Sequence, residues 1–188
     1  MAYANVNRLN GFVPLDNSGR LAAIVKPRPI PLVRQTSDGG NASTDMAVGD
    51  AYSLDGNGNA YRAGPNDLVI GILWGWRVQA VPTVMNGQGP ISIEYVTGAM
   101  TATLLGIEDA GVLFAVYANT FSEINVGGKF NLLDAAPDSL FRVSQQTLNV
   151  SGGAGVQFQL QDIVQSPADN AVGANARVAV RLLQTFNS

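Results

Sequence analysis

The chain contains no histidine and no cysteine among its 188 residues. The lack of histidine excludes an imidazole general base and every Ser-His-Asp triad. The lack of cysteine excludes thiolate nucleophiles, zinc–thiolate sites and disulfides. The remaining catalytic chemistries would need paired carboxylates, a tyrosine or a lysine, and the only lysines are Lys26 and Lys129. The residue inventory therefore predicts that the protein is not an enzyme and has no catalytic residues.

Two acidic segments are the best remaining candidates for chemistry. Glu108 and Asp109 form the only adjacent acidic pair. Carboxylates that act together face each other across a substrate, whereas neighbours on a turn point in different directions. The segment 55–59, Asp-Gly-Asn-Gly-Asn, begins like a calcium loop, but Ala60 and Asn66 stand where that loop needs glycine and glutamate. We therefore expect a loop and a hairpin turn at these places, with no metal and no cofactor.

Glycines and tryptophans give two further candidates. The segment 151–155, Ser-Gly-Gly-Ala-Gly, lacks the lysine of a phosphate-binding loop, so it predicts a turn. Trp74 and Trp76 are separated by Gly75 and are expected on one face of a strand. They could form an aromatic platform for a carbohydrate. Core packing is the preferred interpretation, because the pair ends a nearly continuous apolar run.

The elements that would position these residues are predicted to be strands. Apolar runs rich in β-branched and aromatic residues, and segments that alternate apolar with polar residues, are separated by turn signals. No window has the apolar spacing and the caps of a helix of three turns. The fold class predicted is all-β, a small β-barrel or β-sandwich domain with an extended N-terminal arm. The strand candidates are 67–76, 91–95, 112–117, 156–161 and 175–183.

The first 37 residues differ from the rest in charge and in proline content. Five basic residues against one acidic residue give them a net charge of +4, while six basic and thirteen acidic residues give 38–188 a net charge of −7. Alternating prolines in 26–32 exclude a helix and a central strand. We expect 1–37 to be an extended basic arm and 38–188 a β-rich domain. Residues from about 5 to 34 should reach a partner rather than join the core. The predicted partner-binding residues are Arg8, Arg20, Lys26, Arg28 and Arg34.

The overall composition points to a surface that partner chains cover. Only 13% of the residues are charged, about half the usual fraction, while 46% are hydrophobic. A homotrimer would hide such a surface through cyclic symmetry. The acidic sequence pI of 4.7 argues against a nucleic-acid partner. No apolar run approaches a membrane span and no targeting segment is visible, so we expect no membrane partner and synthesis in the cytoplasm.

Five segments, in this order, carry a resemblance to a known family: 11–14 (Gly-Phe-Val-Pro), 48–54 (with Gly-Asp), 70–75 (Ile-Gly-Ile-Leu-Trp-Gly), 107–116 and 168–180 (with Asp-Asn and Gly-Ala-Asn-Ala). The chain resembles the small structural proteins of tailed-bacteriophage virions known as capsid cement or head decoration proteins. The resemblance spans nearly the whole chain. The proline-rich basic segment 26–34 departs from the family pattern.

The resemblance implies a structural virion protein on the outer surface of the capsid. Such a protein binds the major capsid protein, often at local threefold positions, and stabilises the contacts between capsomers. Two alternatives stay open. The chain could be another virion component, such as a neck or tail protein. It could also be a glycan-binding β domain that uses Trp74, Trp76 and Glu108.

Overall fold

β-Strands make up nearly all of the regular structure in the computed structural model of the chain. The structure describes residues 11–15, 28–31, 45–56, 58, 60–80, 95–96, 101–138, 140, 143–164 and 170–183. One short 3-10 helix, η1 (Glu123–Asn125), is the only helical element among them. The strands are β1 (Val13–Leu15), β2 (Arg28–Pro31), β3 (Met46–Ala47), β4 (Ala51–Leu54), β5 (Ala60–Arg62), β6 (Gly71–Ala80), β7 (Tyr95–Val96), β8 (Thr101–Ile107), β9 (Leu113–Ala118), β10 (Lys129–Leu133), β11 (Thr147–Asn149), β12 (Phe158–Ile163) and β13 (Ala176–Leu182).

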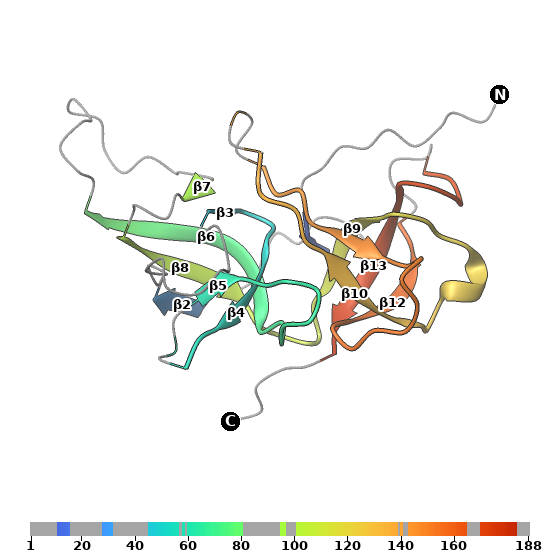
Figure 1. Cartoon of the computed structure of the whole chain (residues 1–188), viewed down its shortest axis with the longest axis horizontal. Coiled ribbons are helices and arrows are strands. Elements are labelled where there is room, and N and C mark those ends of the chain that lie inside the picture. Colours follow the sequence, from blue (N-terminus) through green and yellow to red (C-terminus); the bar gives the residue numbers. More distant parts are fainter. Residues whose placement is uncertain are drawn as a thin grey trace.

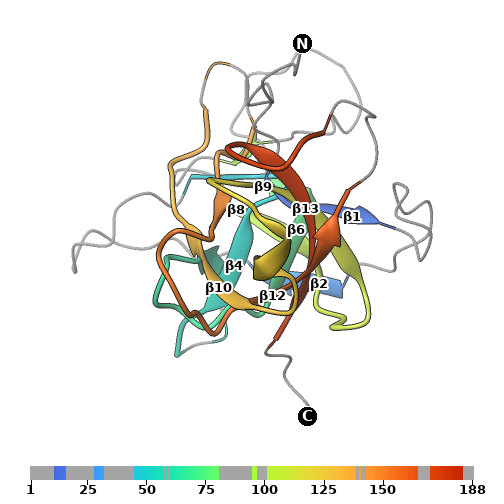
Figure 2. The same ribbon diagram turned by 90° about the vertical axis from the view of Figure 1, so that its right-hand side faces the viewer.

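The largest sheet curls into a small barrel. Its strands lie in the order β1-β9-β11-β10-β12-β13, and β13 pairs back onto β9. That pairing runs antiparallel from Ala176 opposite Ala118 to Arg181 opposite Leu113. It closes the sheet on itself and so removes two exposed edges. The barrel occupies the right side of Figure 1 and faces the viewer in Figure 2.

A second sheet lies beside the barrel. It has five strands in the order β2-β8-β6-β4-β5, and the short pair β3–β7 is separate from it. This sheet forms the left side of Figure 1. Both of its faces carry buried residues, since Ile72 belongs to the main core while its neighbour Leu73 packs into a smaller cluster with Tyr52 and Met46. The prediction of an all-β fold with barrel character is confirmed.

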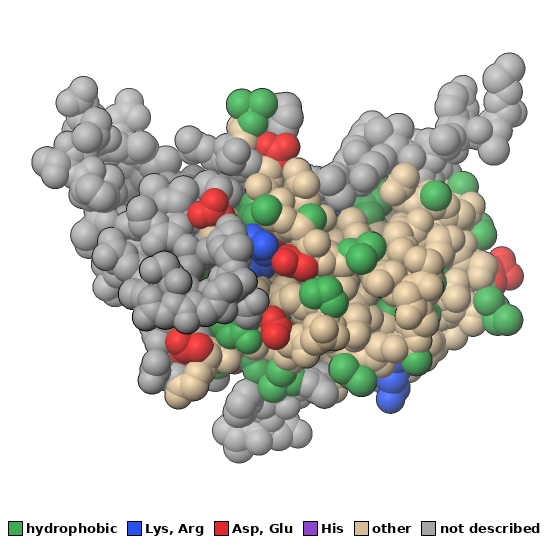
Figure 3. Space-filling view, viewed as in Figure 1, with side chains coloured by type: hydrophobic (Ala, Val, Ile, Leu, Met, Phe, Trp, Pro, Cys, Tyr) green, Lys and Arg blue, Asp and Glu red, His purple; other side chains and the backbone are tan. Residues whose placement is uncertain are grey.

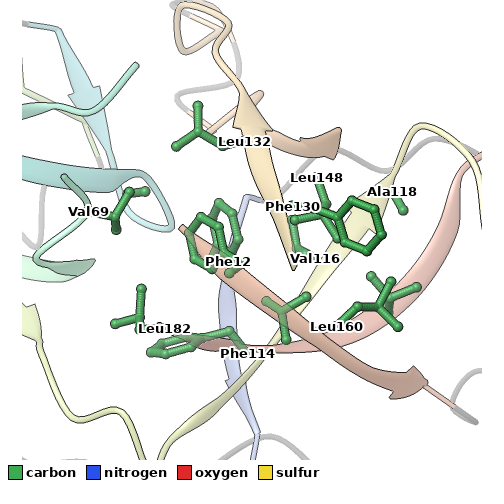
Figure 4. Packing of buried hydrophobic residues seen from close by; sticks show 14 of the residues in the cluster. Phe12, Val69, Phe114, Val116, Ala118, Phe130, Leu132, Leu148, Leu160 and Leu182 are labelled. Carbon is green, nitrogen blue, oxygen red and sulfur yellow. The ribbon is translucent and has the colours of Figure 1, made fainter. Parts of the chain in front are cut away.

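One hydrophobic core connects the barrel and the second sheet. Inward-facing barrel residues such as Phe114 and Leu160 share a cluster with Ile72 of β6 and with Val69, which lies in the connection from β5 to β6. Figure 4 shows Val69 beside the aromatic and aliphatic side chains that fill the barrel. A shared core of this kind makes the two sheets one packed unit.

Two buried glutamines add polar contacts between the sheets. The Ala51 N–H of β4 donates to Gln146 Oε1 (2.6 Å), and Gln146 Nε2 donates to the Ala63 carbonyl (2.9 Å). Gln157 accepts from the Leu132 N–H and donates to two carbonyls of the segment after β5. The strand candidate 156–161 alternates apolar residues with glutamines, a pattern that favours one apolar face and one glutamine face. Gln157 lies just before β12 and is buried, because it satisfies backbone groups between the sheets.

The alternation predicted for the last strand is confirmed. Ala176, Val178, Val180 and Leu182 of β13 are all buried, while Arg181 is exposed. A period of two is what a strand needs when it turns one face to a core. The strand predicted at 112–117 is likewise observed, as β9.

The N-terminal segment corrects one prediction. Phe12 is fully buried and stacks on Phe158 with ring centroids 4.6 Å apart, and β1 pairs with β9. The expectation that 5–34 stays outside the core is therefore wrong for 11–15. Burial of the aromatic ring of Phe12 supplies the free energy that brings this segment into the core. β2 pairs with β8 at the edge of the second sheet. An edge strand tolerates proline, so this position agrees with the prediction that the prolines of 26–32 exclude a central strand.

Two remaining expectations concern boundaries and membranes. The boundary predicted between residues 37 and 38 lies outside the described residues. Within the described part of the chain, no helix has the length and apolar character needed to cross a membrane.

Candidate interaction surface

The basic residues expected to bind a partner cannot be placed as a group. Arg8, Arg20, Lys26 and Arg34 lie outside the described residues. Arg28 is the first residue of β2, at the edge of the second sheet. The described part of the chain thus contains only one of the five residues, and their role as a group stays a prediction.

The acidic pair is used locally. Glu108 and Asp109 lie in the connection between β8 and β9. The Tyr52 hydroxyl donates to Glu108 Oε1 (2.9 Å), and the Gly111 N–H donates to Asp109 Oδ1 (2.7 Å). The first bond holds a buried tyrosine and the second closes an Asx turn, so the predicted loop is confirmed.

The turn predicted at 55–59 is also held by a local hydrogen bond. The Gly58 N–H donates to the Asp55 carbonyl (3.0 Å), and Gly58 has a φ of +81°, within the hairpin that joins β4 to β5. A positive φ of this kind favours glycine. No group of three or more acidic side chains gathers among the described residues.

Trp74 corrects the preferred interpretation of the tryptophan pair. Its side chain is 37% exposed, although core packing was expected. The pairing of β6 with β8 shifts register between Leu73 and Gly75, so Trp74 is the extra residue of a β-bulge. A bulge breaks the alternation from which the buried position was inferred. The side chain of Trp76 lies outside the described part.

Three exposed aliphatic side chains occupy two adjoining loops at one end of the barrel. Ile124 is 89% exposed, Val126 46% and Val172 56%. Ile124 and Val126 belong to the turn around η1, and the loop that carries Val172 is attached to it where the Gly173 N–H donates to the Phe121 carbonyl (3.0 Å). We call these three residues the apolar tip. The coil of η1 marks its place at the right of Figure 1 and near the centre of Figure 2.

Hydrogen bonds fix the turn that carries Ile124. The Ser122 N–H donates to Asn125 Oδ1 (2.8 Å), and the Asn125 N–H donates back to the Ser122 carbonyl (2.9 Å). After the helix, Gly127 adopts a φ of +81° and its N–H donates to the Leu160 carbonyl of β12 (2.8 Å). The turn is therefore hydrogen-bonded both internally and to the barrel, and it keeps the side chain of Ile124 exposed to solvent.

The loop of Val172 is fixed by one asparagine. Asn170 Nδ2 donates to the carbonyls of Val164 (2.7 Å) and Arg177 (2.6 Å), and Asn170 Oδ1 accepts from the Arg177 N–H (2.8 Å). These bonds join the two ends of the connection between β12 and β13. They hold Asn170, two residues before Val172, against both flanking strand ends.

The face of the barrel seen in Figure 3 is poor in charge. Figure 3 shows mainly uncharged atoms over the barrel, with apolar side chains among them and few charged groups. Single exposed aliphatic residues are ordinary, so the apolar tip is a candidate contact surface because its three residues lie on two loops that hydrogen-bond to each other. Sequence reasoning missed the apolar tip. Its only signal was a pair of aliphatic residues between Ser122 and the glycines at 127–128.

Comparisons of the chain with protein-family models, with curated proteins and with solved structures found no match.

Proposed function

We propose that the chain is a structural virion protein that binds the outer surface of a phage capsid and cements the contacts between capsomers. Its partners are then the major capsid protein and further copies of itself. The proposal starts from the ordered resemblance of five segments to capsid cement proteins. The structural observation that supports the proposal is the apolar tip, where the side chain of Ile124 is 89% exposed on a hydrogen-bonded turn.

The physical mechanism of cementing is mass action. A subunit that binds the assembled lattice, and not its separated parts, stabilises the lattice by its own binding free energy. Several modest contacts in one oligomer add up through avidity. A barrel closed by the pairing of β13 with β9, and fixed turns at its end, suit such a role because little has to be ordered on binding.

The test is the occupancy of the protein on particles of the phage that encodes it. We expect Ile124→Ser to bind roughly ten- to a hundredfold more weakly, because burying one aliphatic side chain contributes about 1.5–3 kcal/mol. Leu140→Ser is the matched control, since Leu140 is 79% exposed but lies outside the apolar tip. Occupancy is measured by mass spectrometry of purified particles at graded protein concentrations.

Two outcomes separate the parts of this proposal. If the tip variant occupies capsids as well as the wild type does, the apolar tip is not the contact surface. If the wild-type protein is present in only six to twelve copies per particle, it belongs to a neck or tail and is not a cement.

A glycan-binding role is the second candidate, and the exposed Trp74 is the observation that favours it. An aromatic ring at a surface can stack on a sugar face. Quenching of tryptophan fluorescence by a panel of bacterial surface glycans, lost in Trp74→Ala, would support this function. An unchanged spectrum at millimolar glycan would exclude Trp74 as a platform.

A further inference from the structure

Asp50 is an acid buried at the joint between the two sheets. It lies between β3 and β4 and is fully buried. The Ala47 N–H donates to its Oδ2 (2.7 Å). Its Oδ1 is the one buried side-chain oxygen or nitrogen in the described part of the chain that has no hydrogen-bond partner. A buried ionised carboxylate needs such partners, so this environment disfavours the charge.

The nearest cation is committed elsewhere. Arg62 Nε and a terminal guanidinium nitrogen donate to the two oxygens of Asp134 (2.9 and 3.2 Å), and its other terminal nitrogen donates to the Asp45 carbonyl (3.1 Å). Arg62 therefore acts on Asp50 only through its field, which the charge of Asp134 opposes. Arg62 and Asp134 are the charged groups among the described residues that act on Asp50.

A polar chain connects Asp50 to the joint. The buried Ser144 side chain faces the Asp50 carboxyl, and Ser144 Oγ accepts from the Gln146 N–H (3.3 Å). Gln146 then bonds to Ala51, the residue after Asp50, and to Ala63 across the two sheets. The Ser144 hydroxyl lowers the pKa of Asp50 and so supports the ionised carboxyl, but this support is smaller than the effect of burial.

Burial raises the pKa of Asp50 from 3.8 to about 7. The Ser144 hydroxyl, the Ala47 N–H and the field of Arg62 lower the pKa, and Asp134 raises it, but desolvation is the largest cause. The geometry and this shift agree, because both favour the neutral acid.

We propose that Asp50 is a proton-operated latch at the joint between the barrel and the second sheet. In the neutral form Asp50 places no charge in the buried joint, and its carboxyl lies beside Ser144 at one end of the polar chain. Loss of the proton places an uncompensated charge there and loosens the joint. This proposal does not depend on the capsid function.

The direction of the pH effect follows from linkage. The folded state holds the Asp50 proton more tightly than the unfolded state, so this stabilisation is fully present below about pH 4. It is lost as the pH rises through about 7, because the unfolded chain gives up the proton earlier. Other carboxylates contribute pH effects of their own, so the latch must be measured against a variant that cannot ionise.

The test compares the wild type with Asp50→Asn, which keeps an acceptor for the Ala47 N–H and a donor for Ser144. Urea unfolding is followed at half-unit steps from pH 5 to 9. We expect the unfolding equilibrium constant of the wild type, divided by that of the variant, to rise about tenfold per pH unit up to about pH 7 and then to level off. Asp109→Asn, in an exposed turn, is the control and should leave the pH profile of the wild type unchanged.

A second measurement does not depend on the variant folding. Carbon-13 NMR of the Asp50 carboxyl in the wild type should show a titration near neutral pH, together with faster exchange of the Ala47 and Ala51 amides as the pH rises beyond the intrinsic base-catalysed trend. A carboxyl that titrates near pH 4 would overturn the proposal. So would parallel stability profiles for the wild type and Asp50→Asn.

Discussion

Gln146 and Gln157 are long polar side chains that belong to the interior of this protein. Each accepts from one backbone N–H and donates to backbone carbonyls on the other side of the joint. A buried amide whose hydrogen bonds are all made fixes the relative position of the two sheets. Apolar contacts are not directional and would fix that position less closely. Asp50 lies in the same joint but has one unsatisfied oxygen, and this difference makes it sensitive to the proton.

Gln146→Leu tests the role of the joint at this scale. The substitution leaves the Ala51 N–H and the Ala63 carbonyl buried without their partner, and each such group costs about 1–3 kcal/mol. We expect the free energy of unfolding to fall by about 2–5 kcal/mol in urea at constant pH. Gln161→Leu, at a half-buried position of β12, should change it by less than about 0.5 kcal/mol. Equal effects of the two substitutions would show that Gln146 has no special role.

The strands differ in how far their sequences predict them. β13 can be predicted from its sequence because four alternate apolar residues of the strand face one core. β1 is not, because its three residues include Pro14 and lie in a segment whose charge indicates a solvent-exposed arm. What makes β1 a core strand is distant in the chain, namely its pairing with β9 and the ring of Phe158. Local pattern cannot report contacts over such separations.

Phe12→Ala measures what the segment 11–15 contributes. The substitution removes a fully buried ring that stacks on Phe158, and such truncations cost about 3–5 kcal/mol. We expect a matching loss in the free energy of unfolding, while Val13→Ala, at a half-buried position of the adjoining strand β1, should lose clearly less. If Phe12→Ala unfolds at the urea concentration of the wild type, the N-terminal segment is a dispensable arm after all.

At the scale of the whole molecule, the candidate surface was the least predictable feature. Exposure of Ile124 and Val172 depends on which loops the closed barrel brings together, and the two residues are far apart in the sequence. The basic residues stood out in the sequence because charge is visible there. The apolar tip did not, since aliphatic residues in a β-rich chain are read as core. The burial of Asp50 was not predicted, because a single acid next to a glycine is typical of an exposed turn.

The assembly state is the prediction that belongs to the whole molecule. A chain with 13% charged residues and no cysteine has little surface charge to keep it dispersed and no disulfides to stabilise it. Cyclic self-association covers neutral surface with one repeated contact, and a homotrimer matches the local threefold positions that the family resemblance implies. We therefore expect sedimentation equilibrium to give three times the mass of 19.7 kDa.

The same experiment distinguishes self-association from contact with the shell. If the apolar tip faces the capsid, Ile124→Ser should lower occupancy on particles and leave the sedimenting mass unchanged. If the tip joins neighbouring copies instead, the variant should sediment as a smaller species before any capsid is added. A wild-type protein that is monomeric both in solution and on the particle would contradict the trimer, and the cement would then have to act through single-subunit contacts without avidity.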